Sequence, residues 1–429
     1  MKKVAFITLG CKVNQYETNG MAQKLMSSYK VVDPSEKADI YIVNTCSVTN
    51  MADRKSRQML RRCKELNKDS LVIAVGCYVD TAKDELEQIK EVDLVLGNFQ
   101  KRDIDKYIDS YFEGKKLDDK AIENYFYDFG EVTYTEKTRA TIKVQDGCNS
   151  FCSYCIIPYA RGRICSRKPE SILNEIEKIA SNEIKEVVIT GIQVSSYGQD
   201  FENDYKLVDL LEDINKISGV ERIRLGSLSP TIITDEFCDR IKNIEKLCHH
   251  FHLSLQSGCD KTLKEMNRKY TTSDFEKVVE RLRTLYDDVI LTTDIIVGFP
   301  NETEEDFEKT YEFLKKVKFY KMHVFKYSPR RGTVASKMKN QVPGNIKEER
   351  SKRLIELSNE NEERYLKSYI GKEVEVLFEE KEGEYLKGHT ANYIMVKAKE
   401  DDSNINKICK VKINGCEKEN LICWNVTKR

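Results

Sequence analysis

This sequence of 429 residues has no net charge, no long apolar run and only five histidines. Lysine plus arginine and aspartate plus glutamate both number 71, which excludes a protein that binds nucleic acid through overall basic charge but leaves local basic patches open. No stretch approaches the roughly 18–20 apolar residues that a membrane span requires. The short apolar stretch before Cys11 imitates a leader, but Lys12 follows at once, and a buried first strand explains the pattern better. We therefore expect a cytoplasmic protein with no membrane segment.

Cysteine, by contrast, is abundant, with 14 residues. Secreted proteins use many cysteines as disulfide staples, but such scaffolds are short and rich in loops. This chain is long enough for about two to four domains and shows helical and strand patterns. In such a chain, grouped cysteines more often bind metal ions or clusters in a reducing compartment.

Four apolar runs rich in Val, Ile or Leu punctuate the first hundred residues, with amphipathic stretches between them. The runs are Val4–Leu9, Asp39–Val43, Leu71–Val75 and Val92–Leu96. This pattern predicts a parallel sheet covered on both faces. Three of the strands run directly into Cys11, Cys46 and Cys77, and ligands of open parallel sheets gather at the carboxyl ends of the strands. We expect these cysteines to converge; the alternative, three separate core thiols, explains each one but not the repeated position.

Six further strand candidates alternate with amphipathic helices from Arg139 onward. The strands are Ala140–Val144, Glu186–Thr190, Arg222–Leu225, Phe251–Leu255, Val289–Val297 and Tyr320–Phe325. The helices include Pro169–Ser181, Leu207–Ile217, Ser273–Tyr286 and Thr303–Val317, of which the last two begin at Ser273 and Thr303. Six units predict an incomplete barrel of the TIM type, because a complete one has eight.

The rest of the chain divides around this barrel. Residues 101–138 are acidic and rich in tyrosine, which indicates a linker with one helix. Lys347–Ser368 reads as a connecting helix, and alternating strands at Glu373–Phe378, Ile394–Lys397 and Lys407–Ile413 predict a small all-β domain. The expected α/β organisation is thus a sheet domain (1–100), a linker (101–138), a partial (βα)6 barrel (139–367) and a terminal β domain (368–429). Cys409, Cys416 and Cys423 would be small apolar residues of that last domain.

A tight cysteine motif, Cys148, Cys152 and Cys155, follows the first barrel strand with C-x3-C-x2-C spacing. Such spacing lets one loop place three thiolates on a cubane iron–sulfur cluster. Zinc is the rival, but a closed zinc site needs a fourth ligand, and the five histidines offer no matching pair. Three thiolates leave the fourth iron open to the amino and carboxylate groups of a substrate.

This motif at the start of a partial barrel resembles the radical S-adenosylmethionine (SAM) superfamily. The resemblance implies that the open iron binds SAM and that one electron splits the sulfonium to give a 5′-deoxyadenosyl radical. It also implies SAM contacts in the cysteine loop, in the segments after the strands and around Asp294–Pro300. The residues are Tyr154, Gly191, Gln193, Gln256, Arg268 and Gly298. For each, packing at the barrel mouth is the alternative.

Both cysteine sets and the terminal β domain together resemble the methylthiotransferase family, whose terminal domain is a TRAM-type RNA-binding barrel. The resemblance covers nearly the whole chain and implies two 4Fe–4S clusters. The cluster on Cys148, Cys152 and Cys155 would generate the radical. The one on Cys11, Cys46 and Cys77 would hold the sulfur, which one SAM methylates before a second SAM provides the radical. An electron donor, a sulfur source and a tRNA anticodon stem-loop are the implied partners, and no catalytic residue is assigned beyond the cluster ligands.

The acceptor is indicated by the segment Gly10–Glu17, which resembles the subgroup that modifies N6-threonylcarbamoyladenosine at tRNA position 37. Enzymes of isopentenyladenosine usually show Gln-Met-Asn after the cysteine, and those of a ribosomal-protein aspartate show Lys-Asn-x-x-Asp-Ser. These two acceptors are the alternatives, together with a non-catalytic iron–sulfur protein that binds RNA. Cys259 departs from the family pattern, where serine is usual, and would add a thiol near the barrel mouth.

Two basic groups could contact the RNA. Arg54, Arg57 and Arg61 share one face of a predicted helix beside the sulfur-carrying cysteines. A second group, Arg161, Arg163, Arg167 and Lys168, follows the radical cysteines. We expect both groups to bind anticodon-stem phosphates, although solvated helix faces commonly carry such charges.

Overall fold

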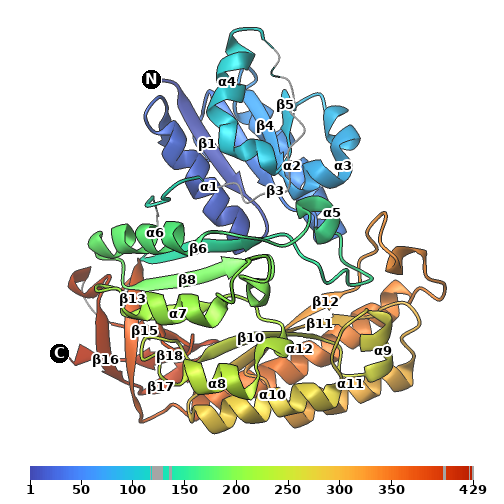
Figure 1. The fold of residues 1–429 in the computed structure, drawn as a ribbon, viewed down its shortest axis with the longest axis vertical. Coiled ribbons are helices and arrows are strands. Elements are labelled where there is room, and N and C mark those ends of the chain that lie inside the picture. The colour runs from blue at the N-terminus through green and yellow to red at the C-terminus, as the bar shows by residue number, and fades with distance from the viewer. Residues whose placement is uncertain (116, 118–128, 135–137, 400–401, 425, 428–429) are drawn as a thin grey trace.

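In the computed structural model, a parallel sheet, a partial barrel and an antiparallel β domain follow one another along the chain (Figure 1). The structure describes residues 1–429 except 116, 118–128, 135–137, 400–401, 425 and 428–429. The α/β fold class that the sequence predicts is confirmed. No helix in these described ranges is long and apolar enough to cross a membrane.

The N-terminal sheet has five parallel strands in the order β2-β1-β3-β4-β5. They are β1 (Lys3–Thr8), β2 (Lys30–Val32), β3 (Ile40–Thr45), β4 (Leu71–Gly76) and β5 (Leu94–Leu96). The helices are α1 (Lys12–Leu25), α2 (Asn50–Leu66), α3 (Cys77–Glu87) and α4 (Ile104–Phe112), the last of these after a short 3-10 turn, η1 (Phe99–Asp103). Side chains of α2 and α3 pack on one face and those of α1 and α4 on the other, so both faces are covered as predicted. The edge strand β2 was not predicted, because three residues are too few to show a pattern.

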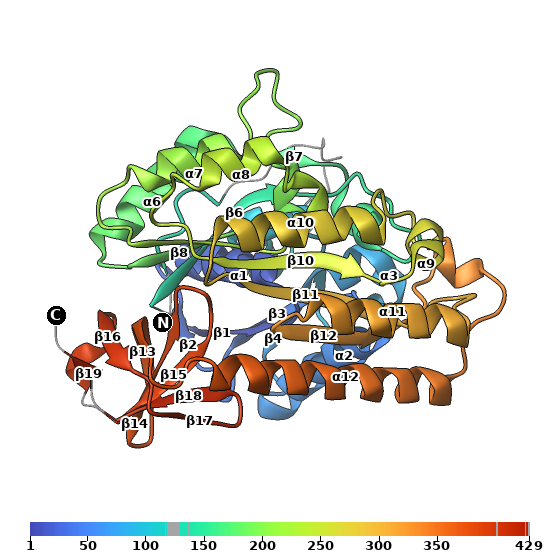
Figure 2. The ribbon, with the colours of Figure 1, turned by 90° about the horizontal axis from the view of Figure 1, so that it is seen from below.

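The barrel consists of two parallel sheets that meet at the bridges Ile223↔Leu247 and Leu228↔Leu253. Its strands are β6 (Arg139–Asp146), β8 (Glu186–Gly191), β9 (Arg222–Leu225), β10 (His250–Gln256), β11 (Ile290–Val297) and β12 (Lys321–Lys326), with a short antiparallel β7 (Cys165–Ser166) beside β6. Its helices are α5 (Ile157–Arg161), α6 (Pro169–Ser181), α7 (Leu207–Asn215), α8 (Asp235–Ile241), α9 (Asp260–Glu265), α10 (Thr272–Leu285), α11 (Glu304–Val317) and α12 (Gly344–Lys367). Figure 2 shows α10, α11 and α12 along the outside of β10–β12. The six-stranded incomplete barrel is therefore confirmed.

Alternation along the strands separates an apolar exterior from a polar lumen. On β6, Ala140, Ile142 and Val144 pack with the outer helices, whereas Lys143 and Gln145 point the other way. The lumen is open between β6 and β12. In the described part of the chain, β12 has no strand neighbour on its far side, and β6 has only the short β7. The N-terminal domain lies over this opening, through α1 against β6 and β8 on one side (Figure 1) and through α2 against the segment after β12 on the other.

Two helix starts illustrate how local signals succeed and fail. Thr303 caps α11, with its Oγ1 accepting from the amide of Asp306, as predicted. The cap of α10 is Thr271 rather than Ser273, so the predicted start was wrong by two residues. The two hydroxyl residues both precede acidic side chains, but only Thr271 is paired with Asp274 in a capping box.

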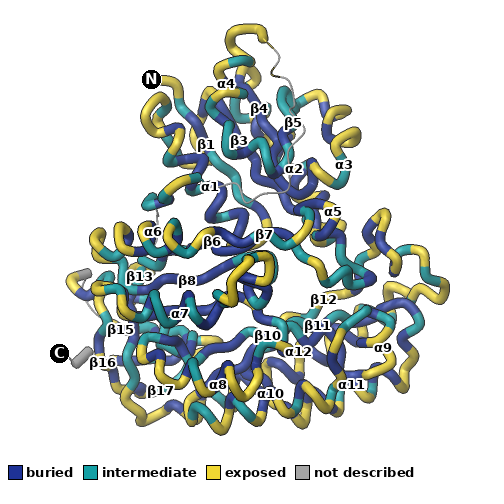
Figure 3. The backbone as a smooth tube through the Cα atoms, in the orientation of Figure 1, coloured by how far each residue is buried: buried dark blue, intermediate teal, exposed yellow. Residues whose placement is uncertain are grey.

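The C-terminal domain is a seven-stranded sheet in the order β17-β18-β15-β14-β13-β16-β19. Its strands are β13 (Glu373–Glu382), β14 (Tyr385–Thr390), β15 (Met395–Ala398), β16 (Ile408–Lys412), β17 (Gly415–Glu417), β18 (Asn420–Cys423) and β19 (Val426–Thr427). Cys409 and Cys423 lie in its core and Cys416 packs at the edge, as small apolar residues would. The same core includes Ile290 and Tyr320 of the barrel, so the domain is attached to the barrel by apolar contacts. Figure 3 shows buried strands in the N-terminal sheet and the barrel, with more exposed helices around them.

Candidate functional site

The loop after β6 carries Cys148, Cys152 and Cys155 and is anchored by backbone hydrogen bonds. The amide of Ser153 donates to the carbonyl of Met266 at 3.1 Å, and the carbonyl of Ser153 accepts from the amide of Ala335 at 2.8 Å. Asn267 Nδ2 donates to the carbonyl of Phe151 at 3.0 Å, and Phe151 has a left-handed φ of 44°. The loop is thus held in its wrapped shape by the chain itself.

The three sulfur atoms of this loop lie close to one another and to polar partners. Cys148 Sγ donates to Gln193 Oε1 at 2.7 Å, and Arg268 donates to Cys152 Sγ at 3.3 Å. Burial, with smaller contributions from the neighbouring Cys152 and Cys148 thiolates, raises the pKa of Cys155 to about 12. Deprotonating all three thiols would require a cation to neutralise them, and three sulfur donors on one loop have the chemistry of an iron–sulfur cluster.

The second cysteine set converges at the carboxyl edge of the N-terminal sheet, as the sequence predicts. Cys11 precedes α1, Cys46 follows β3 and Cys77 begins α3. Gly10 has a φ of 96°, and a Cβ atom there would lie 2.7 Å from Cβ of Cys46, so the backbone approaches this cysteine closely. Burial, with a smaller contribution from the nearby Cys77 and Cys11 thiolates, raises the pKa of Cys46 to about 11. Three thiols at one sheet edge have the donor chemistry of an iron–sulfur cluster, although among the described residues no group of three or more His, Cys, Asp or Glu side chains is already arranged to hold a metal ion.

Arg161, on α5, connects the barrel to this second set. Its Nε lies 3.2 Å from Cys77 Sγ, and its NH2 donates to Asn14 Oδ1 at 2.8 Å. Its NH1 pairs with Glu17 at 2.8 Å and with Asp146 at 3.0 Å. Only 3% of Arg161 is exposed, so its predicted contact with RNA phosphates is wrong. A basic run in the sequence does not reveal which of its members has a buried acidic partner.

Further buried cations surround the same two carboxylates. Lys101, from η1, pairs with Glu17 at 2.6 Å. Lys143, from β6, pairs with Glu17 at 2.8 Å and with Asp146 at 2.5 Å. Although burial acts to raise it, Arg161, Lys101 and Lys143 hold the pKa of Glu17 well below its ordinary value. Both carboxylates therefore stay charged and tie α1 to the barrel strand that leads into the cysteine loop.

The predicted SAM contacts gather in part around the cysteine loop. Gln193 Oε1 accepts from Ser150 Oγ at 2.8 Å as well as from Cys148, and its amide donates to Gln145 Oε1 at 2.8 Å. A Cβ atom added to Gly191 would lie 3.0 Å from the backbone oxygen of Gln145, so Gly191 is packed closely against that residue. These residues line the end of the lumen beside the cysteines.

Arg268 and Tyr154 occupy the opposite side of the loop. Arg268 also donates to Tyr270 Oη and to the carbonyl of Ser254, both at 2.8 Å. Burial and the Cys152 thiolate raise the pKa of Tyr154 well above its ordinary value, although Arg268 opposes this. Tyr154 and Ile296 of β11 both pack against a small buried cluster that includes Met266 and Phe299.

Gln256 and Gly298 end two of the barrel strands. Gln256 is 8% exposed and has a left-handed φ of 72°, which bends the chain at the end of β10. A Cβ at Gly298 would collide with the side chain of Lys347 on α12. The backbone amide of Gly298 donates to Glu302 Oε1 at 2.9 Å. Gly298 therefore lies against α12.

A group of lumen side chains was not singled out from the sequence. His252 Nε2 lies 3.1 Å from Asp294 Oδ2, and His323 Nδ1 lies 3.6 Å from the other oxygen of the same carboxylate. His252 and His250 both contact Thr292 Oγ1, at 2.9 and 3.0 Å. The alternation of the polar residues His250, His252, Ser254 and Gln256 with apolar ones along β10 is the signal that could have indicated an inward polar face.

Of the other basic residues in the two predicted groups, some are exposed and others pair with side chains of the protein. Arg54 and Arg61 are exposed on α2, and Arg163 is exposed with its Cζ 4.5 Å from the Phe151 ring. Arg57 hydrogen-bonds to Tyr78 Oη, which removes it in part from the predicted helix face. Arg167 is buried against Glu175 at 3.0 Å, so the second predicted group was wrong for this member also.

The second edge of the barrel opening is held by Arg330. It pairs with Asp53 at 2.6 Å and donates to Ser47 Oγ at 2.7 Å, both in the N-terminal domain. The hydroxyl of Ser328 accepts from the amide of Asn50 at 3.1 Å. Cys259 follows the carboxyl end of β10 and is buried, with its Sγ 3.6 Å from Asp306 Oδ1.

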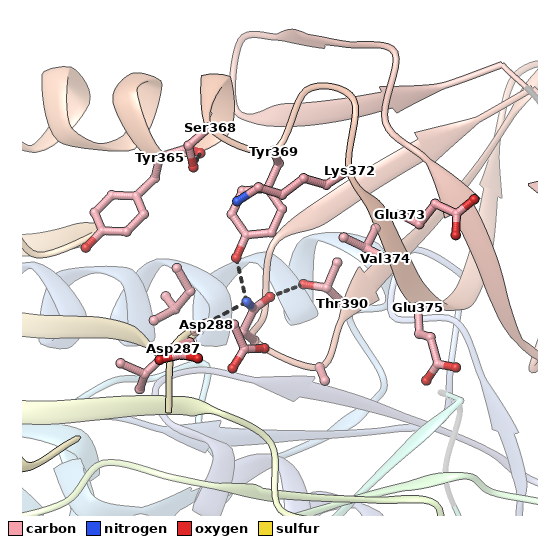
Figure 4. A pocket seen from close by; sticks show the side chains of 14 residues that line it. Asp287, Asp288, Tyr365, Ser368, Tyr369, Lys372, Glu373, Val374, Glu375 and Thr390 are labelled. Carbon is pink, nitrogen blue, oxygen red and sulfur yellow. Dashed lines mark hydrogen bonds between the residues drawn. The ribbon is translucent and has the colours of Figure 1, made fainter. Parts of the chain in front are cut away.

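A separate cavity of about 550 Å³ lies between the C-terminal domain and the start of β11 (Figure 4). Asn392 bridges it, donating to Tyr369 Oη at 2.7 Å and to the carbonyl of Asp288 at 2.9 Å. Neither cysteine triad contributes to its walls.

Comparison with known families identifies both parts of the site. The Radical SAM superfamily profile matches residues 142–314, and that of the Uncharacterized protein family UPF0004 matches residues 3–97. These ranges contain the barrel triad and the strand-end triad respectively.

Two relatives share a name. Threonylcarbamoyladenosine tRNA methylthiotransferase MtaB of Bacillus subtilis (strain 168) is 40% identical over 424 residues, which cover 96% of this chain and 94% of the relative. The protein of the same name in Aquifex aeolicus (strain VF5) is 41% identical over 420 residues, which cover 96% and 100%. A tRNA-2-methylthio-N(6)-dimethylallyladenosine synthase of Caldicellulosiruptor saccharolyticus (strain ATCC 43494 / DSM 8903 / Tp8T 6331) is 36% identical over 423 residues, covering 96% and 90%.

Solved structures share the fold. The radical S-adenosylmethionine methyltransferase TsrM from Kitasatospora setae, with cobalamin and a 4Fe–4S cluster bound, has a TM-score of 0.59 at 14% identity, over 78% of this chain and 77% of that one. The cobalamin-dependent S-adenosylmethionine radical enzyme OxsB has a TM-score of 0.51 at 13% identity, over 85% and 56%. At these identities the likeness concerns the fold alone.

Proposed function

The chain belongs to the methylthiotransferase family of radical SAM enzymes, and we propose that it converts N6-threonylcarbamoyladenosine at tRNA position 37 to its 2-methylthio derivative. The observation that carries this proposal is the identity of about 40% over nearly the whole chain to two relatives of that name. The segment Gly10–Glu17, beside the strand-end cysteines, supports the same acceptor. Isopentenyladenosine is the second candidate, because a synthase for it is 36% identical over a similar length.

The cofactors are SAM and two 4Fe–4S clusters. We assign one cluster to Cys148, Cys152 and Cys155 and the other to Cys11, Cys46 and Cys77, supported by the crowding of each set of thiols. When bound, the first supplies the radical from SAM and the second carries the sulfur that is transferred. For SAM itself we propose Tyr154, Gly191, Gln193, Gln256, Arg268 and Gly298 as contacts, with the strongest support for Gln193 and Arg268, which touch cysteine sulfur.

The chain's own residues hold this arrangement together. Arg161 donates to Cys77 while it is fixed by Glu17 and Asp146, so it orients the strand-end set relative to the barrel. Arg330 and its contacts with Asp53 hold the N-terminal domain over the open side of the lumen. The enclosure would exclude thiols and other small hydrogen donors, which matters because a carbon radical of the substrate must meet sulfur before it meets such a donor.

The partner is tRNA, and we propose that the anticodon stem-loop is the part bound. Arg54 and Arg61 on α2 and Arg163 after the cysteine loop are exposed and suit phosphate contacts. The C-terminal domain, residues 368–429, resembles RNA-binding TRAM domains and would add a further contact. The chemistry also needs an electron donor and a sulfur source, and tRNA as substrate supports a cytoplasmic location.

Purified, anaerobically reconstituted protein should be incubated with SAM, dithionite and a stem-loop that carries N6-threonylcarbamoyladenosine. We expect 5′-deoxyadenosine, S-adenosylhomocysteine and the 2-methylthio nucleoside. Product only from an isopentenyladenosine stem-loop would replace the acceptor with the second candidate. Product from neither stem-loop, with methylthiolation of a ribosomal-protein aspartate, would overturn the tRNA assignment, and no SAM cleavage at all would overturn the enzymatic one.

A further inference from the structure

The side chain of Lys12 lies in the lumen next to the strand-end cysteines. Lys12 is the first residue of α1 and directly follows Cys11, so the two Cα atoms are about 3.8 Å apart. Both residues are exposed to solvent, although α1 contacts the barrel strands β6 and β8. Lys12 Nζ lies 6.0 Å from the ring of Tyr393, which comes from the C-terminal domain. Its ammonium group therefore points from the cysteine edge toward the far end of the lumen.

The ring of Tyr393 also lies close to two arginines, and each of these has a carboxylate partner. Arg224 Cζ lies 4.7 Å and Arg139 Cζ lies 5.4 Å from the ring centre. Arg224 pairs with the buried Glu186 at 2.6 Å, and Arg139 pairs with Glu379 at 3.0 Å. The two arginines are therefore neutralised by the protein.

Lys12 differs from both arginines. Among the described residues, no carboxylate oxygen lies within 4.0 Å of its Nζ, and no acceptor lies within hydrogen-bond distance. An ammonium group without an anionic partner gains a charge-assisted hydrogen bond when an anion binds beside it. We therefore expect the partner of this ammonium group to be an anion that enters the lumen with the substrate.

The substrate of the proposed function carries such an anion. The threonyl part of N6-threonylcarbamoyladenosine ends in a carboxylate, whereas the isopentenyl group of the alternative acceptor is apolar. On adenine, C2 and C6 flank N1, so the N6 substituent extends beside C2 when C2 faces sulfur held at the Cys11 set. A side chain one residue from Cys11 is within reach of that substituent.

We propose that Lys12 Nζ binds the threonyl carboxylate and so selects threonylcarbamoyladenosine over isopentenyladenosine. This inference rests on the proposed function. Tyr393 keeps the ammonium in place by a cation–π contact, and its loop is fixed because the amides of Thr390 and Ile394 are both hydrogen-bonded within it. Lys12 is thus a specificity residue, distinct from the six cysteines.

The test compares equilibrium binding of three stem-loops without dithionite, so that no turnover occurs. The stem-loops carry threonylcarbamoyladenosine, its methyl ester, or unmodified adenosine. The proteins are wild type, Lys12→Met, Lys12→Arg and, as a matched control, Lys68→Met, which changes an exposed lysine far along the chain. Iron content and visible absorption establish that each protein holds its clusters.

For the wild type, we expect the methyl ester to bind at least about 30-fold more weakly than the carboxylate form, because it leaves the ammonium unpaired. Lys12→Met should lose the same factor on the carboxylate form and respond to the ester by less than about 3-fold. Lys12→Arg should keep most of the preference, and Lys68→Met should behave as wild type.

Three outcomes would overturn the inference. A preference retained by Lys12→Met would place the carboxylate elsewhere. An equal loss on all three stem-loops would make Lys12 a phosphate contact, and weakened SAM binding without RNA would make it a contact of the SAM carboxylate. If Lys12→Met does not hold its clusters, the ester comparison on the wild type still decides whether a cation reads the carboxylate, and Lys12→Arg decides whether it is Lys12. Failure of the proposed function is distinct, since the wild type would then show no preference for threonylcarbamoyladenosine and no methylthiolation of it.

Discussion

Arg161 donates from Nε to Cys77 Sγ across 3.2 Å, although the two residues are 84 positions apart and belong to different domains. The contact couples the helix that follows the radical cysteine loop to the cysteine set proposed to carry sulfur. Because Arg161 is buried with Glu17 and Asp146, its replacement removes a positive charge that stabilises both buried carboxylates.

Arg161→Gln should therefore lower the free energy of unfolding by about 3–5 kcal/mol, the cost of breaking a buried ion pair. It should also lower the reduction potential of the strand-end cluster, because a positive charge beside the sulfur favours the reduced state. Denaturation in urea and an EPR-monitored redox titration measure the two effects. The exposed Arg163→Gln serves as control, and an unchanged potential in Arg161→Gln would contradict the electrostatic role.

The two cysteine sets should be separable by mutation. Cys148→Ala should abolish 5′-deoxyadenosine formation, whereas Cys77→Ala should retain it and lose methylthio transfer, because the sets serve different steps. Each variant should hold about four iron atoms where the wild type holds about eight. Cys416→Ala, in the C-terminal domain, should leave both the iron content and the products unchanged. Full iron in Cys77→Ala would remove Cys77 from the cluster ligands.

Closure of the lumen depends on Arg330. Arg330→Ala leaves Asp53 buried without its partner and should destabilise the contact between domains by about 3–5 kcal/mol. We expect more 5′-deoxyadenosine per methylthio product, because an open lumen lets thiols, buffer and other solutes donate hydrogen to the radical in place of the substrate. Product ratios by liquid chromatography measure this, with the neighbouring exposed Arg331→Ala as control. An unchanged ratio would mean that other contacts suffice for closure.

The exposed arginines of α2 should contribute to tRNA binding through phosphates. Replacing Arg54 and Arg61 together with Gln should weaken binding and reduce the slope of log K against log salt by about 0.9 for each duplex phosphate that these arginines neutralise in the wild type. Binding measured between low and moderate salt gives the slope, and Lys315→Gln on the exposed side of α11 is the control. A parallel salt dependence in the double variant would exclude this face. Arg57 is left intact because its hydrogen bond with Tyr78 makes a loss ambiguous.

Glu175 should make stability depend on pH. Burial raises its pKa to about 7, although Arg167 opposes the shift. The folded state therefore holds this proton more tightly than the unfolded state, so the contribution is greatest below the ordinary glutamate pKa and is lost as pH rises through 7. Glu175→Gln should abolish this pH dependence, which amounts to up to about 3 kcal/mol in the free energy of unfolding. Urea denaturation at acidic and mildly alkaline pH, without oxygen, measures it, and curves that stay parallel for wild type and variant would refute the assignment.

Much of the fold could be predicted because local patterns report burial. Continuous apolar runs such as Leu71–Val75 identified the parallel strands, and the spacing of Cys148, Cys152 and Cys155 identified the loop after β6. The strand β2 could not be predicted, since it is an edge strand of three residues whose pairing with β1 depends on the finished sheet. The cap of α10 was misplaced because three consecutive hydroxyl residues, Thr271, Thr272 and Ser273, compete within one turn and only the folded geometry selects Thr271.

The sequence by itself determined the fold class, the family and the loop motif of Cys148, Cys152 and Cys155, because apolar periodicity and close cysteine spacing are local properties of the chain, whereas the grouping of Cys11, Cys46 and Cys77 was predicted from the sheet topology and the resemblance. Only the tertiary structure decided which charges are buried together. It paired Arg161 with Glu17 instead of RNA, placed His252 beside Asp294, and brought Tyr393 from the C-terminal domain to Lys12. The physical reason is that a charge is assigned its role by the partner it meets across the fold, and that partner is set by packing between elements remote in the sequence.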